Sequence, residues 1–87
     1  FRSESALPEV VQGIQQLAGA FPEIEVVNEA LTLHMGPEFI LVTLSVDFED
    51  TQTAANVERV IRELDAGIKK AFPLVKRVFV EGEARRT

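Results

Sequence analysis

The tripeptide Ala-Phe-Pro occurs twice, at residues 20–22 and 71–73, and each copy follows a stretch with helical periodicity and precedes one rich in β-branched residues. Proline disfavours the helical conformation at the preceding residue and cannot donate to a helical hydrogen-bond ladder. Both copies therefore predict the same corner, where a helix ends and a strand begins. Because a second strand-patterned segment follows the first, the chain is predicted to run helix, strand, strand, helix, strand.

Two segments carry apolar residues at the three- and four-residue steps of an amphipathic helix. The first covers residues 7–21, with Pro8 tolerated in its first turn, and the second covers 54–72 after a polar joint that offers helix N-caps. Gly67 interrupts the second helix at a cost of about 1 kcal/mol relative to alanine, which indicates either close packing or tolerance. The apolar stripe of the first helix is Leu7, Val10, Val11, Ile14, Leu17, Ala18 and Phe21.

Three segments, residues 24–35, 39–48 and 75–81, alternate between two sets of side chains as strands do. Gly36 and Pro37 mark a turn that folds the first two into a hairpin. The sequence thus predicts an α+β fold in which two helices cover one face of a three-stranded sheet. The strand residues predicted to face the helices are Leu31, Leu33, Ile40, Val42, Leu44, Val46, Phe48, Val78 and Val80.

The alternate side chains of these strands form the second face of the sheet, which neither predicted helix covers. Phe39, Leu41 and Phe79 share this predicted outer face, and three large apolar groups on so small a surface indicate burial against another surface. Self-complementary contacts usually close as two-fold dimers, so we expect a homodimer. A terminus folded over the face, or an ordinary mixed surface, is the alternative. The outer parity also carries Thr32, His34, Thr43 and Glu81, and the predicted dimer interface is Phe39, Leu41, Thr43 and Phe79.

Composition excludes several classes of function. The chain has no cysteine, so disulfides and thiolate chemistry are absent, and its net charge of −5 argues against a nucleic-acid partner. Its apolar runs are shorter than the ~18 residues that a bilayer helix requires. No nucleophile elbow or phosphate-binding loop is present, so we expect no enzyme. Residues 1–87 are predicted to form one domain with an ordered core over about 6–83, and the start at Phe1 without a signal-peptide pattern indicates a piece of a longer protein.

His34 is the single histidine, and alone it makes no zinc site, since zinc takes about four ligands. Glu81 and Glu83 share one parity of the last strand and could supply oxygen ligands, and a dimer would double every ligand. The sequence therefore suggests a divalent metal site formed by His34, Glu81 and Glu83. A histidine that merely packs near the turn, beside carboxylates at a solvated strand end, is the alternative.

Four segments carry a family resemblance: SALPEVVQGI, LHMGPEFILVTLSVDFED, VERVIRELDAGIKKAFP and RVFVEGE. The most specific elements are the Gly36-Pro37 turn between two strands and the closing succession of helix, Phe-Pro, strand and acidic end. Over almost its whole length the chain resembles the cytoplasmic C-terminal domain of the cation diffusion facilitator transporters, which are proton-coupled exporters of zinc and related divalent metals.

The resemblance implies a ferredoxin-like or metallochaperone-like αββαβ sandwich that hangs below a six-helix membrane domain on the cytoplasmic side of the cell membrane. It implies a homodimer, the transmembrane domain of the same full-length chain as a partner, and a regulatory divalent metal such as zinc, manganese, cobalt or iron between protomers. Where zinc-exporting members carry histidines, the matching positions are Asn28, Thr43 and Glu81, with Glu83 in place of a final aspartate. A stand-alone ferredoxin-like sensor of a small ligand, or a purely structural dimerisation module, remains the alternative.

Overall fold

The structure of the protein is a computed structural model, which describes residues 8–84. The chain runs α1 (Pro8–Gly19), β1 (Ile24–Gly36), β2 (Phe39–Phe48), α2 (Ala54–Ala71) and β3 (Val75–Ala84), which confirms the predicted order of elements. Leu7, which the sequence assigned to the first helical stripe, lies outside the described residues. No helix within residues 8–84 is long and apolar enough to cross a membrane.

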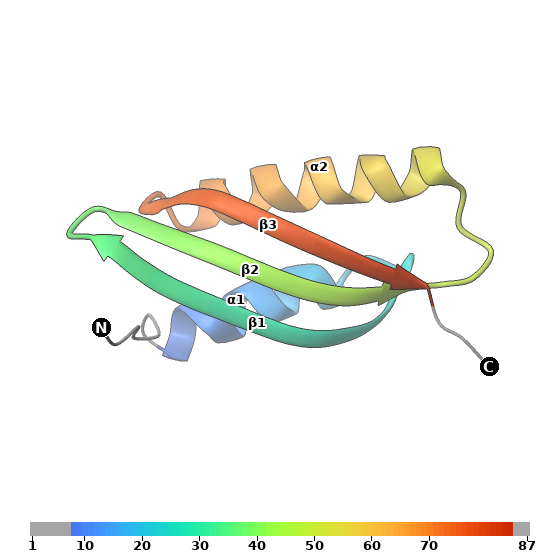
Figure 1. Ribbon diagram of the computed structural model, residues 1–87, viewed down its shortest axis with the longest axis horizontal. Coiled ribbons are helices and arrows are strands. Elements are labelled where there is room, and N and C mark those ends of the chain that lie inside the picture. Colours follow the sequence, from blue (N-terminus) through green and yellow to red (C-terminus); the bar gives the residue numbers. More distant parts are fainter. Residues whose placement is uncertain (1–7, 85–87) are drawn as a thin grey trace.

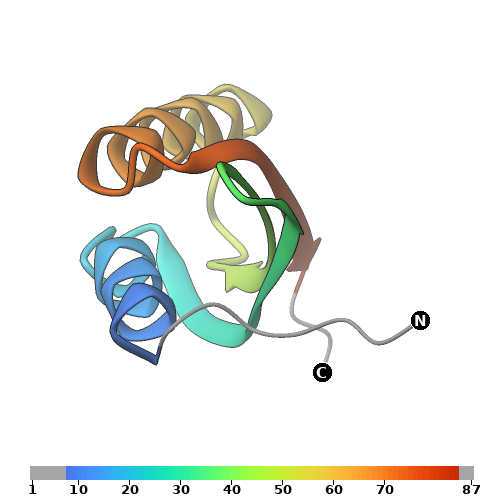
Figure 2. The same ribbon diagram turned by 90° about the vertical axis from the view of Figure 1, so that its left-hand side faces the viewer.

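The three strands form one sheet in the order β1-β2-β3 (Figure 1). β1 pairs with β2 in antiparallel fashion, as the predicted hairpin requires, and β2 pairs with β3 in parallel. Both helices lie on the same face of this sheet, and no element of the described chain covers the other face (Figure 2). The predicted αββαβ sandwich, a ferredoxin-like arrangement, is therefore confirmed.

The two Ala-Phe-Pro corners close with the same hydrogen bond. The amide of Ile24 donates to the carbonyl oxygen of Phe21 at 3.1 Å, and the amide of Val75 donates to that of Phe72 at 2.9 Å. In each case the bond spans three residues across the proline, whose missing N–H is not needed there. The repeated tripeptide thus produces the same helix-to-strand turn twice, as the sequence predicted.

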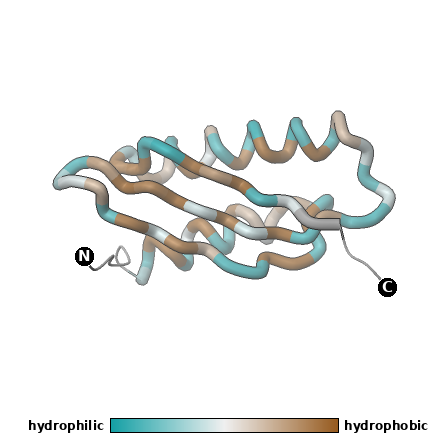
Figure 3. Tube along the Cα trace, in the orientation of Figure 1, coloured by the Kyte–Doolittle hydropathy of each residue, from teal (hydrophilic) through white to brown (hydrophobic). Residues whose placement is uncertain are grey.

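The hydrophobic core lies between the helices and the inner face of the sheet. Its β2 members alternate strictly along the strand. Hydrophobic positions, drawn in brown, recur along the strands and helices in Figure 3. Val78 and Val80 of β3 pack against this core, as predicted. The buried hydrophobic residues are Ile14, Ala18, Ile24, Ile40, Val42, Leu44, Val46, Phe48, Val60, Leu64, Ile68 and Val75.

The predicted faces of β1 were wrong over its second half. Val27 pairs with Val46, but Glu29 pairs with Ser45, so β1 holds an extra residue, Asn28, at this point. A bulge of this kind reverses the parity of the residues that follow it, here from Glu29 to the next register shift after His34. Thr32, predicted outside, is buried against the helices at 1% exposure, whereas Leu31, predicted inside, is 46% exposed on the outer face.

The same bulge reverses the faces that the sequence predicted for Leu33 and His34. Leu33 pairs with Leu41 on the outer face, and His34 pairs with the buried Ile40, so His34 belongs to the helix-facing parity, although its side chain is exposed at the end of the strand. The alternation of β1 was visible in the sequence, but the position where it reverses was not.

Two helix glycines have opposite environments. A Cβ on Gly13 of α1 would lie 2.5 Å from Cζ of Phe72, so the ring at the end of α2 occupies the space that this glycine leaves. A Cβ on Gly67 of α2 would meet no atom within 4 Å. Gly67 is therefore tolerated rather than required, which settles the choice that its sequence position left open.

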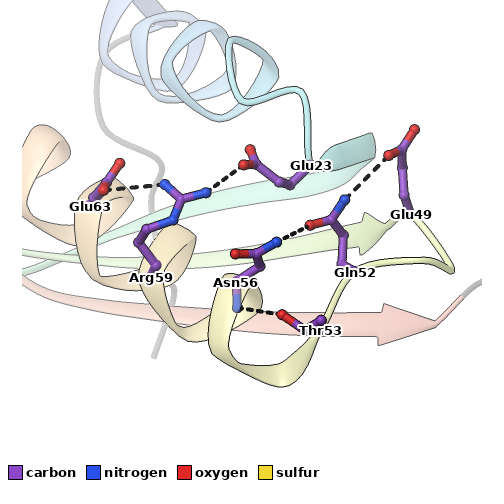
Figure 4. A network of polar contacts seen from close by, with 7 residues as sticks. All are labelled: Glu23, Glu49, Gln52, Thr53, Asn56, Arg59 and Glu63. Carbon is purple, nitrogen blue, oxygen red and sulfur yellow. Dashed lines mark hydrogen bonds and ion pairs between the residues drawn. The ribbon is translucent and has the colours of Figure 1, made fainter.

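Polar contacts fix the start of α2 over the sheet (Figure 4). The side chain of Thr53 caps the helix by accepting a hydrogen bond from the amide of Asn56 at 3.1 Å. Arg59 forms a short ion pair with Glu23, in the turn between α1 and β1, and a second pair with Glu63 at 3.2 Å. The hydrogen bond to Glu23, followed by that to Glu63, raises the pKa of Arg59 above its usual value.

Candidate functional site

The outer face of the sheet is organised in rows of residues that lie side by side on the three strands. One row consists of Leu33, Leu41 and Arg77, and the next of Leu31, Thr43 and Phe79. A third row places Glu29, Ser45 and Glu81 together. Along the strands the face therefore changes from apolar, near the β1–β2 hairpin, to acidic near the opposite end.

The apolar rows form a band that no described element covers. Phe79 is 51% exposed, Leu31 is 46% exposed, and Phe39, at the hairpin end of the face, is 37% exposed. The structure therefore brings the predicted interface residues Phe39, Leu41, Thr43 and Phe79 onto one face, with the side chains of Leu41 and Thr43 half-buried. The sequence missed Leu31 and Leu33, because only the bulge at Asn28 turns them outward.

The acidic end of the outer face gathers oxygen-bearing side chains. The side-chain amide of Asn28 donates a 3.0 Å hydrogen bond to Oδ1 of Asp47, whose backbone position lies beside that of Glu83. Asn28 is the bulge residue, so the same irregularity that reverses β1 also directs this amide to Asp47. The three positions that the family resemblance singled out, Asn28, Thr43 and Glu81, thus lie along one face.

Two of the three predicted metal ligands, His34 and Glu81, are not brought together within one copy. His34 lies on the helix-facing parity beside Ile40, whereas Glu81 lies on the outer face beside Ser45, several rows away. The side chain of Glu83 lies outside the described part of the structure. Among the residues that are described, no group of three histidine, aspartate or glutamate side chains could hold a metal ion.

The chemistry available on the outer face is that of a contact surface. The apolar band can bury its side chains against a second surface, and Asn28, Asp47 and Glu81 beside it offer amide and carboxylate oxygens. Such oxygen ligands suit hard cations such as Mn²⁺ or Mg²⁺ better than soft ones.

Comparison of the sequence with protein-family models and with curated proteins finds no match. Solved structures do match. The nickel form of one MamM CTD variant has a TM-score of 0.79 at 16% identity, over 92% of this chain and 100% of the other. The cadmium form of another variant has a TM-score of 0.80 at 16% identity, over 93% of this chain and 100% of the other.

A manganese form of a third MamM CTD variant matches with a TM-score of 0.76 at 16% identity, over 88% of this chain and 96% of the other. At this level of identity the likeness establishes the fold. The chain thus has the fold of the MamM C-terminal domains, which are cytoplasmic domains of a cation diffusion facilitator transporter, the family that its sequence motifs resemble.

Proposed function

We propose that this chain is the cytoplasmic C-terminal domain of a cation diffusion facilitator transporter, where it acts as a dimerisation and regulatory module. The membrane domain of the same full-length protein would carry the cation, and the family resemblance implies a zinc-type divalent cation exported in exchange for protons. One observation carries the proposal: a fold shared with the MamM C-terminal domains leaves an apolar band bare on the face opposite its helices.

The apolar band supports the dimerisation part of the proposal. Leu31 and Phe79 lie in one row of the sheet, and each leaves about half of its surface in water. A contiguous exposed surface of this kind is typical of a protein contact. A second copy would present the same band, and a two-fold contact between the two bands would bury both.

The acidic end of the outer face supports a response to divalent cations. In such a dimer, Asp47 and Glu81 of each copy would lie at the margin of the contact, where a cation could be shared between copies and reduce the repulsion between carboxylates. His34 takes no part in this arrangement, since it lies on the other parity of β1. The similar structures include nickel, cadmium, copper and manganese forms of MamM CTD variants.

The metal part of the proposal is tested by calorimetry with Mn²⁺ and Zn²⁺ on the whole chain. We expect measurable heat with both ions and its loss in Glu81→Gln, which removes a charged oxygen ligand without changing the size of the side chain. Thr43→His supplies an imidazole nitrogen on the same face, so it should raise the affinity for Zn²⁺ more than that for Mn²⁺.

Arg62→His on the exposed side of α2 is the matched control, because it adds the same imidazole away from the outer face. An increase in zinc affinity as large in Arg62→His as in Thr43→His would contradict a site on the outer face. Absence of heat and of any thermal shift with every divalent cation would remove the metal response and leave a purely structural dimerisation module.

A further inference from the structure

One end of the molecule combines exposed apolar side chains from three neighbouring strand ends. Met35 precedes the hairpin turn and is 59% exposed, Phe39 follows the turn and is 37% exposed, and Leu74 precedes β3 and is 43% exposed. These ends are neighbours because the amide of Ile40 donates a 2.9 Å hydrogen bond to the carbonyl oxygen of Leu74. We call Met35 and Leu74 the apolar tip, since Phe39 belongs to the face that meets a second copy in the proposed dimer.

Most of the described cations lie in the segments next to the apolar tip. Of the six lysines and arginines in residues 8–84, four lie in the last turn of α2 or at the start of β3, namely Lys69, Lys70, Lys76 and Arg77. The ammonium of Lys76 donates a 2.9 Å hydrogen bond to the carbonyl oxygen of Pro73, which holds it beside the loop that carries Leu74. Lys69 pairs with Asp65 at 3.1 Å, and Glu9 and Glu38 are the other acids at this end.

The opposite end of the molecule has the reverse character. Its turns and strand ends carry Glu23, Glu25, Asp47, Glu49 and Asp50. Arg59, the cation on the first half of α2 that reaches this end, is already paired with Glu23 and Glu63. A chain with a net charge of −5 thus concentrates most of its described cations at one end, around exposed apolar groups.

The chain also enters the domain at the end that carries the apolar tip. α1 begins there, on the same side of the molecule as the hairpin and the end of α2 (Figure 1). Its first turns contact that end of the molecule, because Val10 lines a small apolar cavity of about 170 Å³ together with Phe72, Pro73 and Leu74. Whatever precedes α1 in a longer protein therefore joins the domain beside the apolar tip.

We propose that the apolar tip rests on an anionic membrane surface, with Met35 and Leu74 in the headgroup region and Lys70 and Lys76 against lipid phosphates. The proposal rests on the proposed function, in which a membrane domain precedes α1. Exposed apolar side chains with lysine and arginine nearby are the combination that binds the interface of anionic bilayers. The acidic opposite end is repelled by the same surface, so the charges also orient the domain.

Leu74→Trp tests the contact directly, since the chain has no tryptophan or tyrosine and the new indole is its only long-wavelength fluorophore. We expect its emission to shift to shorter wavelength on vesicles that contain phosphatidylglycerol, and to stay unchanged on pure phosphatidylcholine. Val26→Trp is the control, because Val26 is 37% exposed at the acidic end and should show no shift. No shift for Leu74→Trp on either vesicle, or an equal shift on both, would overturn the proposal.

Charge reversal tests whether the lysines near the apolar tip contribute to membrane binding. Lys70→Glu should weaken sedimentation with phosphatidylglycerol vesicles by about tenfold, whereas Arg62→Glu, the same change of charge near the middle of α2, should have a smaller effect. Equal effects of the two variants would mean that the overall charge of the protein, and not the position of the lysine, governs binding. That result would contradict the proposal. Light scattering of the same samples without lipid reports dimerisation separately, so a failure of membrane binding is distinguishable from a failure of the proposed function.

Discussion

The two faces of the sheet carry similar side chains but have different surroundings. Leu44 on the inner face has no exposed surface, and Leu31 on the outer face keeps 46% of its surface in water. Alternation along a strand creates both faces at once, and only the packing of α1 and α2 decides which one becomes the core. The apolar part of the outer face therefore resembles a core surface that lacks a covering layer.

Truncating a leucine should reduce stability far more on the inner face of the sheet than on the outer face. Leu44→Ala should lower the free energy of unfolding by about 3 kcal/mol, because it leaves a cavity among fully buried residues. Leu31→Ala, the same truncation on the outer face, should cost less than about 1 kcal/mol in the monomer. Urea unfolding at low protein concentration measures both. Similar losses for the two variants would show that the outer face is covered within a single copy.

A smaller effect tests how closely the helices fit over the inner face. Gly13→Ala should destabilise the domain by about 2 kcal/mol, because its methyl group would collide with the ring of Phe72. Gly67→Ala should instead stabilise α2 by up to about 1 kcal/mol, since it meets no neighbouring atom and favours the helix. Thermal unfolding of both variants shows directly whether each substitution raises or lowers the stability of the domain. A neutral Gly13→Ala would mean that α1 and the end of α2 are not in close contact.

The smallest change in stability is expected at the N-terminus of α2. Thr53→Ala should cost about 1 kcal/mol, because it removes the oxygen that accepts a hydrogen bond from the amide of Asn56. Thr51→Ala, two residues earlier in the exposed joint, is the matched control and should be near neutral. Urea unfolding compares them, and an equal loss in both variants would refute a specific capping role for Thr53.

The sequence predicted the fold wherever one local rule determined the structure. The Ala-Phe-Pro corners and the strict alternation of β2 needed no further information, because proline geometry and a strand period of two suffice. β1 was different, since Asn28 is an unremarkable residue in a continuous strand pattern and its bulge is set by pairing with β2. One inserted residue moved Leu31 and Leu33 outward and Thr32 inward.

The candidate site was predicted in part, for the same reason. Phe39, Leu41 and Thr43 lie on β2, which alternates strictly, and Phe79 pairs with Thr43 in the regular part of β3, so all four were placed correctly on the outer face. His34 lies beyond the bulge of β1 and was assigned to the wrong parity, which separated it from Glu81. Whether two copies complete a metal site depends on how they meet, and the geometry of a dimer is not encoded in the periodicity of one strand.

In the proposed dimer the outer face of the sheet, and not the face covered by the helices, meets a second copy. Single cysteines make this directly measurable, because the chain has none of its own. Spin labels at Ser45→Cys on the outer face and at Arg62→Cys on the exposed side of α2 report which face lies near the partner. We predict a dimer in which the Ser45 labels lie close together and the Arg62 labels lie far apart. A monomer at high micromolar concentration, or a shorter distance between the Arg62 labels, would contradict the claim.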